Sequence, residues 1–376
     1  MNSFIHFGCW NNKRCDIEKS ENGMSLVIKN LLEKTSPNFY IIAGDNYYPE
    51  KIKDKQTKNK KKVLNTDNFQ SGFHCISLLN EKAPVYMLMG NHDLQYENSL
   101  YNNNRELINK CSIIDEEIKY KEIFNFDRYH TLLGNNTLIL FLNSIFYTAD
   151  KDSSLDCFQL YRPNYPSYIY DSIEKIKNFE ENILRFLVEI YLSKEKKIEN
   201  IIIVAHDPIL SRRTKINKEN GKKKEIRTPL LEDGLIFLEN IYDFFPEANK
   251  YYLCADVHQY QEGIIKLGEN EIYQYVVGTG GADCDEECSP LEDNFFPNVD
   301  GANYFGFTNT QLSFKLIRCE RSFGYLECIL KDNNELEFQY HRVAECEIDK
   351  KGGRKIKNRL TKKKYVKKMK TNKKII

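Results

Sequence analysis

Five short apolar runs, each followed by polar or turn-forming residues, constrain the fold of this chain most strongly. They are apolar at both odd and even positions, which is typical of strands buried on both faces. Helix-like stretches lie between them, clearest at 172–192 and weaker at 23–34 and 235–244. Hairpins are predicted with turns at Gly134–Asn136 and Asp332–Asn334. This alternation predicts a layered α/β core with a mixed or parallel sheet. The five runs are SFIHF before Gly8, FYIIA before Gly44, VYMLM before Gly90, NIIIVA before His206 and YYLCA before Asp256.

The chain of 376 residues is long enough for one large domain or two smaller ones. We expect one domain over residues 1–345, followed by a C-terminal tail at 346–376. Two surface excursions are predicted within the domain, a lysine-rich loop at 51–64 and a Tyr/Pro-rich insertion at 146–171. Apolar residues at 41% are sufficient for a substantial core.

Positive charge is concentrated in the tail. Residues 350–376 contain 14 Lys and Arg residues and no acidic residue, whereas the whole chain has a net charge of only +1. The remainder is therefore acidic. The tail is predicted either as a solvated, disordered appendage or as an arm that binds nucleic acid or an anionic surface. In the second case it would also direct nuclear or nucleic-acid localisation.

The cysteines and the N-terminus bear on the cellular compartment. The chain has 11 cysteines without a framework spacing, and no secretory signal is recognisable near the start. No transmembrane segment is expected, because the apolar runs are too short for a membrane span. These observations favour free thiols in a reducing, intracellular and cytoplasmic environment.

Polar residues able to bind metal ions follow four of the apolar runs. The carboxyl ends of neighbouring parallel strands meet at one edge of an α/β sheet, so these side chains are expected to converge. Carboxylate, amide and imidazole donors suit Mn²⁺, Fe or Zn²⁺. Two such ions about 3.5–4 Å apart would bind a phosphate ester and activate water for hydrolysis. The residues concerned are Asp45, Tyr48, Asn91, His92, His206, Asp256 and His258.

The series GDNYY, GNHD, VAHDP and ADVH resembles the motifs of the calcineurin-like metallophosphoesterases. Within that family, GDNYY is most similar to the GDNFY-type motif of purple acid phosphatases, and VVGTGGA at 276–282 resembles the segment after the last metal motif. The resemblance covers roughly residues 3–282, and loosely the closing strands to 343. It implies a four-layer α/β/β/α sandwich of two mixed β-sheets flanked by helices.

Residue by residue, the resemblance implies a binuclear metal centre. Asp45 would bridge the two ions. Tyr48 would ligate the first ion as a phenolate, together with His258. Asn91 and His206 would hold the second ion.

His92 would lie beside the scissile phosphate, where it stabilises charge or protonates the leaving oxygen. Two positions depart from the family pattern. Cys9 occupies the place of the first-motif aspartate, where it is either a thiolate ligand or a buried thiol. Asp256 replaces a histidine at the second ion and should favour a harder metal. Asn11 stands where many family members have another ligand, but a neutral amide is a poor replacement.

The sequence therefore predicts a metal-dependent phosphoesterase with two ions drawn from Fe, Zn and Mn, acting by metal-bound hydroxide attack and preferring phosphomonoesters. An alternative is a binding or scaffolding protein on a catalytically impaired phosphoesterase fold, because two metal motifs are altered. A third possibility gives the main role to the tail, which would tether the acidic body to nucleic acid or an anionic surface.

Overall fold

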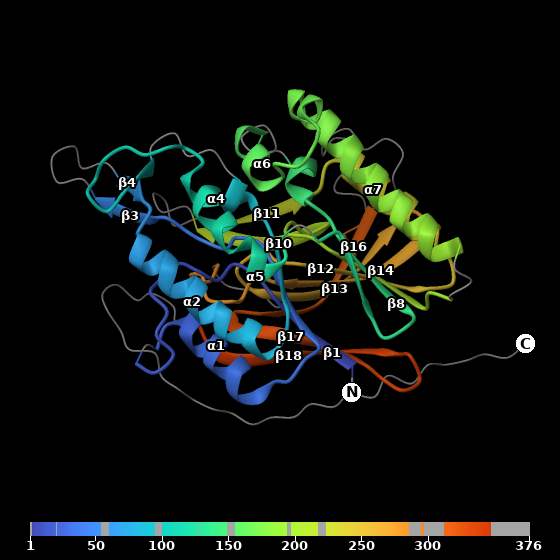
Figure 1. The fold of residues 1–376 in the computed structure, drawn as a ribbon. Helices are drawn as coiled ribbons and strands as arrows, with labels where there is room; N and C mark the ends of the chain where they lie inside the picture. Colours follow the sequence, from blue (N-terminus) through green and yellow to red (C-terminus); the bar gives the residue numbers. More distant parts are fainter. Residues whose placement is uncertain are drawn as a thin grey trace, which may run out of the picture.

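The computed structural model places the secondary structure in two large β-sheets with helices on their outer sides (Figure 1). The structure describes residues 2–19, 21–53, 60–94, 100–126, 128–148, 155–193, 197–216, 223–285, 295–296 and 312–346.

The first sheet has five strands in the order β18-β17-β1-β2-β5. The strands β1, β2 and β5 run parallel to one another, and β17 pairs antiparallel with β1. In β2 and β5 every residue is buried, as the unbroken apolar runs predict. The bounds are β1 (Asn2–Phe7), β2 (Phe39–Ala43), β5 (Val85–Leu88), β17 (Ser322–Leu330) and β18 (Leu336–Glu345).

The second sheet has eight strands in the order β15-β16-β13-β14-β12-β9-β8-β7. Its centre is parallel across β8, β9, β12 and β14, and its two ends are antiparallel. Both large sheets are therefore mixed. The bounds are β7 (His130–Leu133), β8 (Thr137–Phe141), β9 (Asn200–Val204), β12 (Asn249–Cys254), β13 (Tyr260–Leu267), β14 (Asn270–Val277), β15 (Phe295–Phe296) and β16 (Leu312–Glu320).

Helices cover the outer side of each sheet. On one side α1 contacts β17 and β18 and packs against α2 (Figure 1). On the other side α8 contacts β14 and α7. The helix predicted at 172–192 is confirmed as α7, which buries a stripe that includes Ile176, Leu184 and Val188. The bounds are α1 (Gly23–Lys34), α2 (Thr66–Lys82), α3 (Asn91–Leu94), α4 (Ser112–Glu117), η1 (Ile118–Tyr120), α5 (Lys121–Phe124), η2 (Ser144–Tyr147), α6 (Leu155–Tyr161), η4 (Ser167–Asp171), α7 (Ile173–Ser193) and α8 (Glu232–Asp243).

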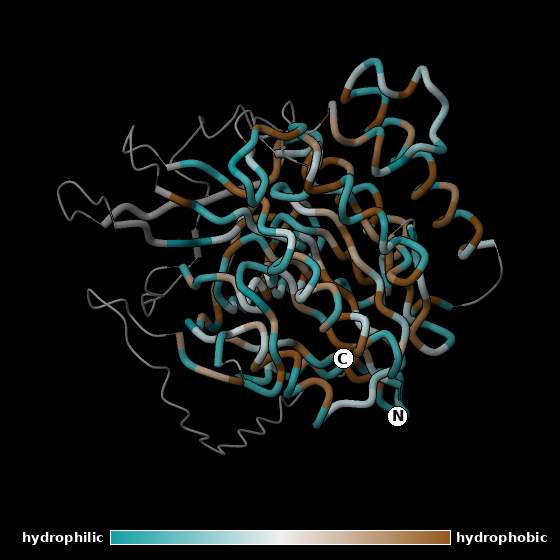
Figure 2. Tube along the Cα trace, turned by 60° about the vertical axis from the view of Figure 1, so that its left-hand side comes forward, coloured by the Kyte–Doolittle hydropathy of each residue, from teal (hydrophilic) through white to brown (hydrophobic). Residues whose placement is uncertain are grey.

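The core lies between the two sheets, where apolar segments concentrate along the central strands (Figure 2). Aromatic rings join the sheets, because Phe338 of β18 lies 4.8 Å from Tyr251 and 4.5 Å from Tyr275 between ring centroids. The two polar groups His6 Nε2 and the Cys254 carbonyl oxygen also meet across this interface, 3.1 Å apart. The prediction of two mixed sheets flanked by helices is confirmed.

Two smaller sheets form from segments between the main elements. The lysine-rich stretch predicted as a loop contains an antiparallel pair, β3 (Glu50–Lys53) and β4 (Lys60–Val63), and β6 (Leu100–Tyr101) pairs parallel with β4. The loop prediction is therefore wrong for those residues. A separate hairpin follows β9 and consists of β10 (Leu210–Ile216) and β11 (Lys223–Pro229).

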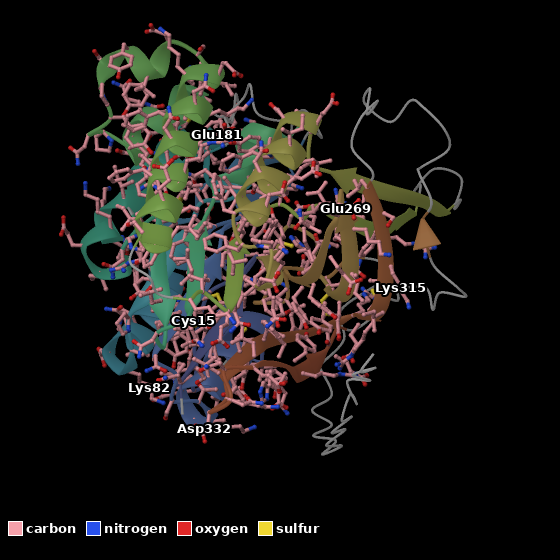
Figure 3. All side chains as sticks on the ribbon, turned by 90° about the vertical axis from the view of Figure 1, so that its right-hand side faces the viewer. Cys15, Lys82, Glu181, Glu269, Lys315 and Asp332 are labelled. Carbon is pink, nitrogen blue, oxygen red and sulfur yellow. A yellow bond between two sulfur atoms is a disulfide. The ribbon has the colours of Figure 1, made fainter. Side chains whose placement is uncertain are left out.

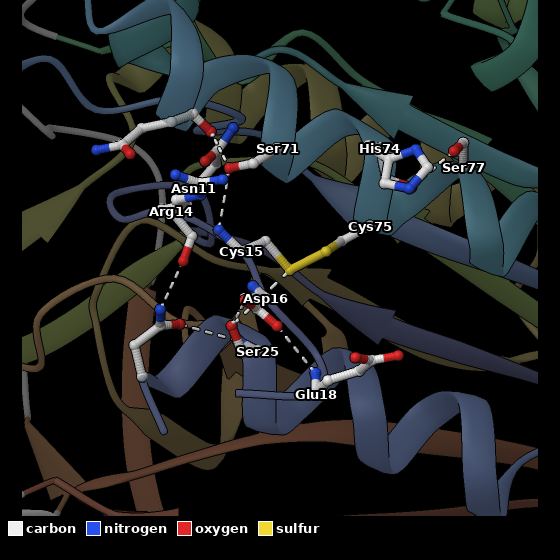
Figure 4. Close-up of a disulfide and its surroundings, with 12 residues drawn as sticks. Asn11, Arg14, Cys15, Asp16, Glu18, Ser25, Ser71, His74, Cys75 and Ser77 are labelled. Carbon is white, nitrogen blue, oxygen red and sulfur yellow. Dashed lines mark hydrogen bonds between the residues drawn. A yellow bond between two sulfur atoms is a disulfide. The ribbon is translucent and has the colours of Figure 1, made fainter. Parts of the chain in front are cut away.

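Seven of the described cysteines are disulfide-bonded, so the expectation of free thiols is wrong for them. The pairs in which both cysteines are described are Cys15–Cys75, Cys111–Cys157 and Cys284–Cys346. The first joins the loop after β1 to α2, and the backbone N–H of Cys15 donates a hydrogen bond of 3.0 Å to Ser71 Oγ on the same helix (Figure 4). The intracellular compartment stays a prediction, and free thiols no longer support it. The buried free cysteines are Cys9, Cys254 and Cys328.

Charged side chains occupy the periphery, where Lys82, Glu269, Lys315 and Asp332 are exposed (Figure 3). No described helix combines the length and the apolar character needed to cross a bilayer. The basic tail lies almost entirely outside the described residues, which end at Cys346. The domain boundary at 345 and the role of the tail therefore stay predictions.

Candidate metal centre

The loops that follow β1, β2, β5, β9 and β12 meet at one edge of the two sheets. Backbone hydrogen bonds connect them, since Cys9 N–H donates to the Gly44 carbonyl at 3.1 Å and Ala255 N–H donates to the His206 carbonyl at 2.9 Å. The backbone N–H of His92 donates to Asp45 Oδ1 at 3.0 Å. The convergence expected from the strand ends is therefore present.

Three residues of these loops adopt a left-handed backbone. The φ angles are 54° for Cys9, 53° for Asp45 and 50° for Asp256. For residues other than glycine, this backbone conformation costs roughly 1–2 kcal/mol per residue. Each of the three is the second residue after a strand, where the tight turn aims its side chain at the shared edge. Such strain is a common property of functional sites.

Glycine is required where two of the loops touch. A Cβ atom on Gly90 would stand 2.4 Å from both the backbone nitrogen and Oδ1 of Asp45, and one on Gly44 would stand 2.7 Å from His206 Nδ1. Neither distance allows a side chain. The glycines of GDNYY and GNHD therefore bring the carboxylate of Asp45 against the imidazole of His206.

Tyr48, Asp45 and His258, which were predicted with Cys9 as ligands of the first metal ion, lie in contact and define a first candidate metal position. The phenol of Tyr48 donates a hydrogen bond of 2.6 Å to Asp45 Oδ2 and lies 2.9 Å from His258 Nε2. His258 Nδ1 lies 2.6 Å from the Asp283 carbonyl oxygen, and since that oxygen can only accept, Nδ1 carries the proton. His258 Nε2 is therefore the ring nitrogen that faces Tyr48 and would be the one to bind a metal ion.

Cys9 is fully buried, and its Sγ lies 3.9 Å from Asp45 Oδ2. Burial and the neighbouring Asp45 carboxylate raise the pKa of the thiol well above its ordinary value. Without a cation the thiol is therefore neutral, and only a bound metal ion would stabilise the thiolate that can serve as a ligand. Asn11 does not approach this position, because its amide donates to the Phe69 carbonyl at 3.4 Å and packs against α2.

His206 is the centre of the second metal position, which also includes Asp45, Asn91 and Asp256. Its Nδ1 lies 2.7 Å from the Ala43 carbonyl oxygen, so Nδ1 carries the proton and Nε2 faces the site. Nε2 is 3.2 Å from Asn91 Oδ1 and 3.3 Å from Asp45 Oδ1. Although burial disfavours the charged ring, Asp45 and two further carboxylates raise the pKa of His206 to about 9.

Asp207 belongs to this cluster, although its neighbour His206 was the only residue of VAHDP predicted as a ligand. Ligand atoms of His206, Asp207 and Asp256 all lie within 4.8 Å of one another, as do those of Cys9, Asp45 and His206. Burial raises the pKa of Asp207 to about 6, and the Ser144 hydroxyl donates to its Oδ2 at 2.7 Å. The sequence could have predicted Asp207 as a ligand, because this carboxylate directly follows the histidine at the end of a strand.

A buried network supports the loop that carries His92. Asp93 accepts hydrogen bonds from Gly90 N–H at 2.8 Å and from Asn46 N–H at 2.8 Å. Burial raises the pKa of Asp93 to about 7, and it raises the pKa of the neighbouring Glu117 well above its ordinary value. Glu117, which is fully buried, therefore keeps its proton at neutral pH beside the Asp93 carboxyl. This network fixes α3, and with it Asn91 and His92.

All eight residues predicted for the site thus lie in one connected set around Asp45 and His206, but their individual roles stay predictions. Within the described residues, His92 Nδ1 is buried without a hydrogen-bond partner, and its ring centroid lies 4.8 Å from that of Tyr48. The donor types fit metal ions, because the carboxylate and amide oxygens converge with the two imidazole rings on the same space. A bound metal ion would take the place of the proton on His206 Nε2.

The fold and the site together define a two-sheet α/β protein with a cluster of carboxylates and imidazoles at its strand ends that could hold metal ions. Residues 3–260 match the calcineurin-like phosphoesterase family, which is more than half of the chain. The chain therefore belongs to this family, whose members typically hydrolyse phosphoester bonds with a binuclear metal centre. No curated protein sequence matches the chain.

Solved structures similar to this chain include a purple acid phosphatase, PPD1, from yellow lupin (Lupinus luteus) seeds. The identity is 15% and the TM-score 0.49, over 92% of this chain and 52% of that one. The chain thus spans about half the length of that phosphatase. GAP50, the anchor in the inner membrane complex of Plasmodium, is 13% identical with a TM-score of 0.47, over 95% of this chain and 89% of that one.

Proposed function

We propose that this protein is a metal-dependent phosphoesterase that hydrolyses phosphate esters, with phosphomonoesters as the preferred class. The observation that carries the proposal is the placement of Asp45 between two ligand sets. Its Oδ2 accepts from Tyr48 at 2.6 Å, while its Oδ1 lies 3.3 Å from His206 Nε2. One carboxylate thus faces both metal positions, which is what a bridging ligand requires.

When bound, two metal ions would supply Lewis acidity and an activated water for attack on phosphorus. The residues of the chain provide the remaining functions. Backbone carbonyls hold His206 and His258 by Nδ1, so that Nε2 of each ring is turned toward the site, and Asp45 aligns the two ligand sets. His92, whose backbone is fixed by Asp45, lies beside the site where a leaving oxygen would need a proton.

Burial lowers the pKa of His92, although Asp45 opposes this shift. The imidazole is then largely neutral at pH 7 in the metal-free protein and must gain a proton before it can act as an acid. A phosphate dianion in the site would favour that protonation, since it places negative charge next to the ring. Binding of the substrate would in this way favour the protonated form of His92, which could then donate a proton to the leaving oxygen.

The test is hydrolysis of p-nitrophenyl phosphate and bis-p-nitrophenyl phosphate by purified protein supplied with Mn²⁺, Fe²⁺ or Zn²⁺. We expect faster turnover of the monoester and loss of at least 10²-fold in kcat for Asp45→Asn, because the amide cannot bridge two cations. Asp332→Asn, at an exposed position remote from the site, is the matched control. Absence of turnover with all three metals would refute the proposal.

The metals themselves are proposed as two ions from Fe, Zn and Mn. Tyr48 and Cys9 at the first position favour iron or zinc, because a phenolate oxygen suits ferric iron and a thiolate is a soft donor that suits zinc and iron. Asp207 and Asp256 at the second position favour a harder ion such as Mn²⁺. Metal analysis of protein purified without chelators measures both identities.

A second candidate function is binding or scaffolding by an impaired phosphoesterase fold. The observation that favours it is the neutral, fully buried thiol of Cys9 in place of a charged ligand. In that case the purified protein would hold one ion or none and would not turn over either ester. The same metal analysis and assay therefore distinguish the two candidates.

We further propose that residues 1–345 form one domain and that the basic tail at 346–376 binds nucleic acid or an anionic surface. Salt-sensitive binding to DNA, RNA or anionic vesicles should disappear when residues 350–376 are deleted. Unchanged binding would exclude that role. Intracellular localisation also stays a proposal, which fractionation of expressing cells can test.

A further inference from the structure

The segment 280–285 crosses the candidate metal centre and contacts both altered metal motifs. Gly280 N–H donates to the Gly8 carbonyl at 3.0 Å, and Ala282 N–H donates to the Cys9 carbonyl at 2.9 Å. The segment thereby follows the loop after β1 and then reaches His258. Its sequence places one cysteine, Cys284, between two aspartates.

Asp283 and Asp285, the two sequence neighbours of Cys284, both form hydrogen bonds with His258. The carbonyl oxygen of Asp283 accepts from His258 Nδ1 at 2.6 Å, which sets the tautomer of the ring. Asp285 Oδ2 accepts from His258 N–H at 3.0 Å, and Asp285 N–H donates to the His258 carbonyl at 3.1 Å. Three hydrogen bonds from two residues therefore orient this one ligand.

The disulfide Cys284–Cys346 fastens the centre of that contact. Cys346 directly follows the last residue of β18 in the five-stranded sheet, whereas His258 follows β12 in the eight-stranded sheet. The bond thus fixes the segment to the opposite sheet from the histidine that it holds. The ion pair of Asp283 with Lys13 at 2.8 Å is largely exposed and adds little.

This disulfide differs from the other two pairs in its accessibility. Cys15, Cys75, Cys111 and Cys157 are at most 6% exposed, whereas Cys284 and Cys346 are half-buried. Thiolate attack on a disulfide needs access to a sulfur atom. Among the three disulfides that join two described cysteines, the bond beside the candidate metal centre is therefore the most open to reduction.

We propose that the Cys284–Cys346 disulfide positions His258 as a metal ligand, so that its reduction by a dithiol weakens the first metal position. The proposal rests on the proposed metal-dependent function. In the reaction the dithiol gives two electrons and two protons to the disulfide. The products are the thiols of Cys284 and Cys346 and the oxidised, disulfide form of the reductant. Freed from β18, segment 283–285 no longer holds the ring in one orientation.

The experiment compares the full chain with the double variant Cys284→Ser/Cys346→Ser in calorimetric titrations with Zn²⁺. Loss of a group that orients a ligating histidine typically costs 10–100-fold in metal affinity. We expect a rise of that size in Kd at the first position and little change at the second. The matched control is Cys111→Ser/Cys157→Ser, which removes the disulfide between the residue before α4 and α6 and should leave the Kd of the first position unchanged.

A metal-free measurement separates this proposal from the proposed function. The ¹⁵N shifts of the His258 ring should show the Nδ1-protonated tautomer in the oxidised chain and a mixture of tautomers in the double variant. If the oxidised chain bound no metal, the proposed function would fail while this readout still tested the positioning. Unchanged tautomer and unchanged Kd would overturn the proposal. Should the variant not fold, partial reduction of the oxidised chain by dithiothreitol, mapped by mass spectrometry, gives the same comparison.

Discussion

Replacement of Cys9 by aspartate tests how the charge at the first metal position is balanced. The new carboxylate would lie where Sγ now stands, 3.9 Å from Asp45 Oδ2. Two like charges about 4 Å apart repel by about 4 kcal/mol at an effective dielectric constant of about 20. We therefore expect Cys9→Asp to destabilise the metal-free protein by up to about 4 kcal/mol, or to raise the pKa of one carboxyl instead.

A divalent ion between the two carboxylates removes that repulsion. The affinity of the first position should therefore rise by up to about 10³-fold, because about 1.4 kcal/mol corresponds to a factor of ten. Thermal unfolding with a chelator measures the loss of stability in the metal-free variant, and thermal unfolding with metal measures how much of that stability is regained. Calorimetric titration with Mn²⁺ measures the metal affinity. Cys9→Ser, which adds no charge, is the control.

Two results would refute this reasoning. Equal stability of Cys9→Asp and Cys9→Ser without metal would mean that the side chain at position 9 does not face Asp45. Unchanged metal affinity, despite a destabilised metal-free protein, would mean that the first position does not bind an ion.

Three further predictions concern single side chains. Tyr48→Phe removes the phenol that contacts Asp45 and His258, so an iron-loaded protein should lose its visible phenolate charge-transfer absorption; a colourless iron-loaded parent protein would contradict this role. Asp207→Asn should weaken binding of Mn²⁺ more than binding of Zn²⁺, measured by titration, because a hard carboxylate is lost; equal changes for both metals would argue against Asp207 as a ligand. Burial lowers the pKa of His6 from 6.5 to about 4, so between these pH values the unfolded chain binds a proton that the folded chain excludes. Stability should thus fall as the pH drops through this window, and His6→Gln should reduce that slope by up to about 1.4 kcal/mol per pH unit in denaturant titrations; equal slopes would show that His6 does not contribute.

The strands and the position of the site could be predicted because their signals are local. A run such as FYIIA is apolar on both faces, and such strands are buried wherever they stand in a sheet. Asp45 and His206 come directly after such runs, so their convergence follows from the parallel order of the strands. The alternation did not specify how many sheets would form; that expectation came from the family resemblance.

The disulfides could not be predicted because their partners are distant in sequence. Cys15 and Cys75 are separated by 60 residues, and Cys284 and Cys346 by 62. Pairing depends on which surfaces the fold brings together, and cysteine spacing does not contain that information. The lysine-rich strands β3 and β4 were missed for a related reason, since a charged sequence without alternation gives no strand signal.

The left-handed backbone at Cys9, Asp45 and Asp256 has a consequence for protein engineering. Glycine adopts this conformation without steric strain, and at Asp256 it would also remove a carboxylate that lies close to Asp207. A library of variants selected only for heat resistance in the absence of metal would therefore accumulate glycine at proposed metal-binding positions such as Asp256. Directed evolution of a thermostable form should include the metal ion, or a substrate, in every round of selection.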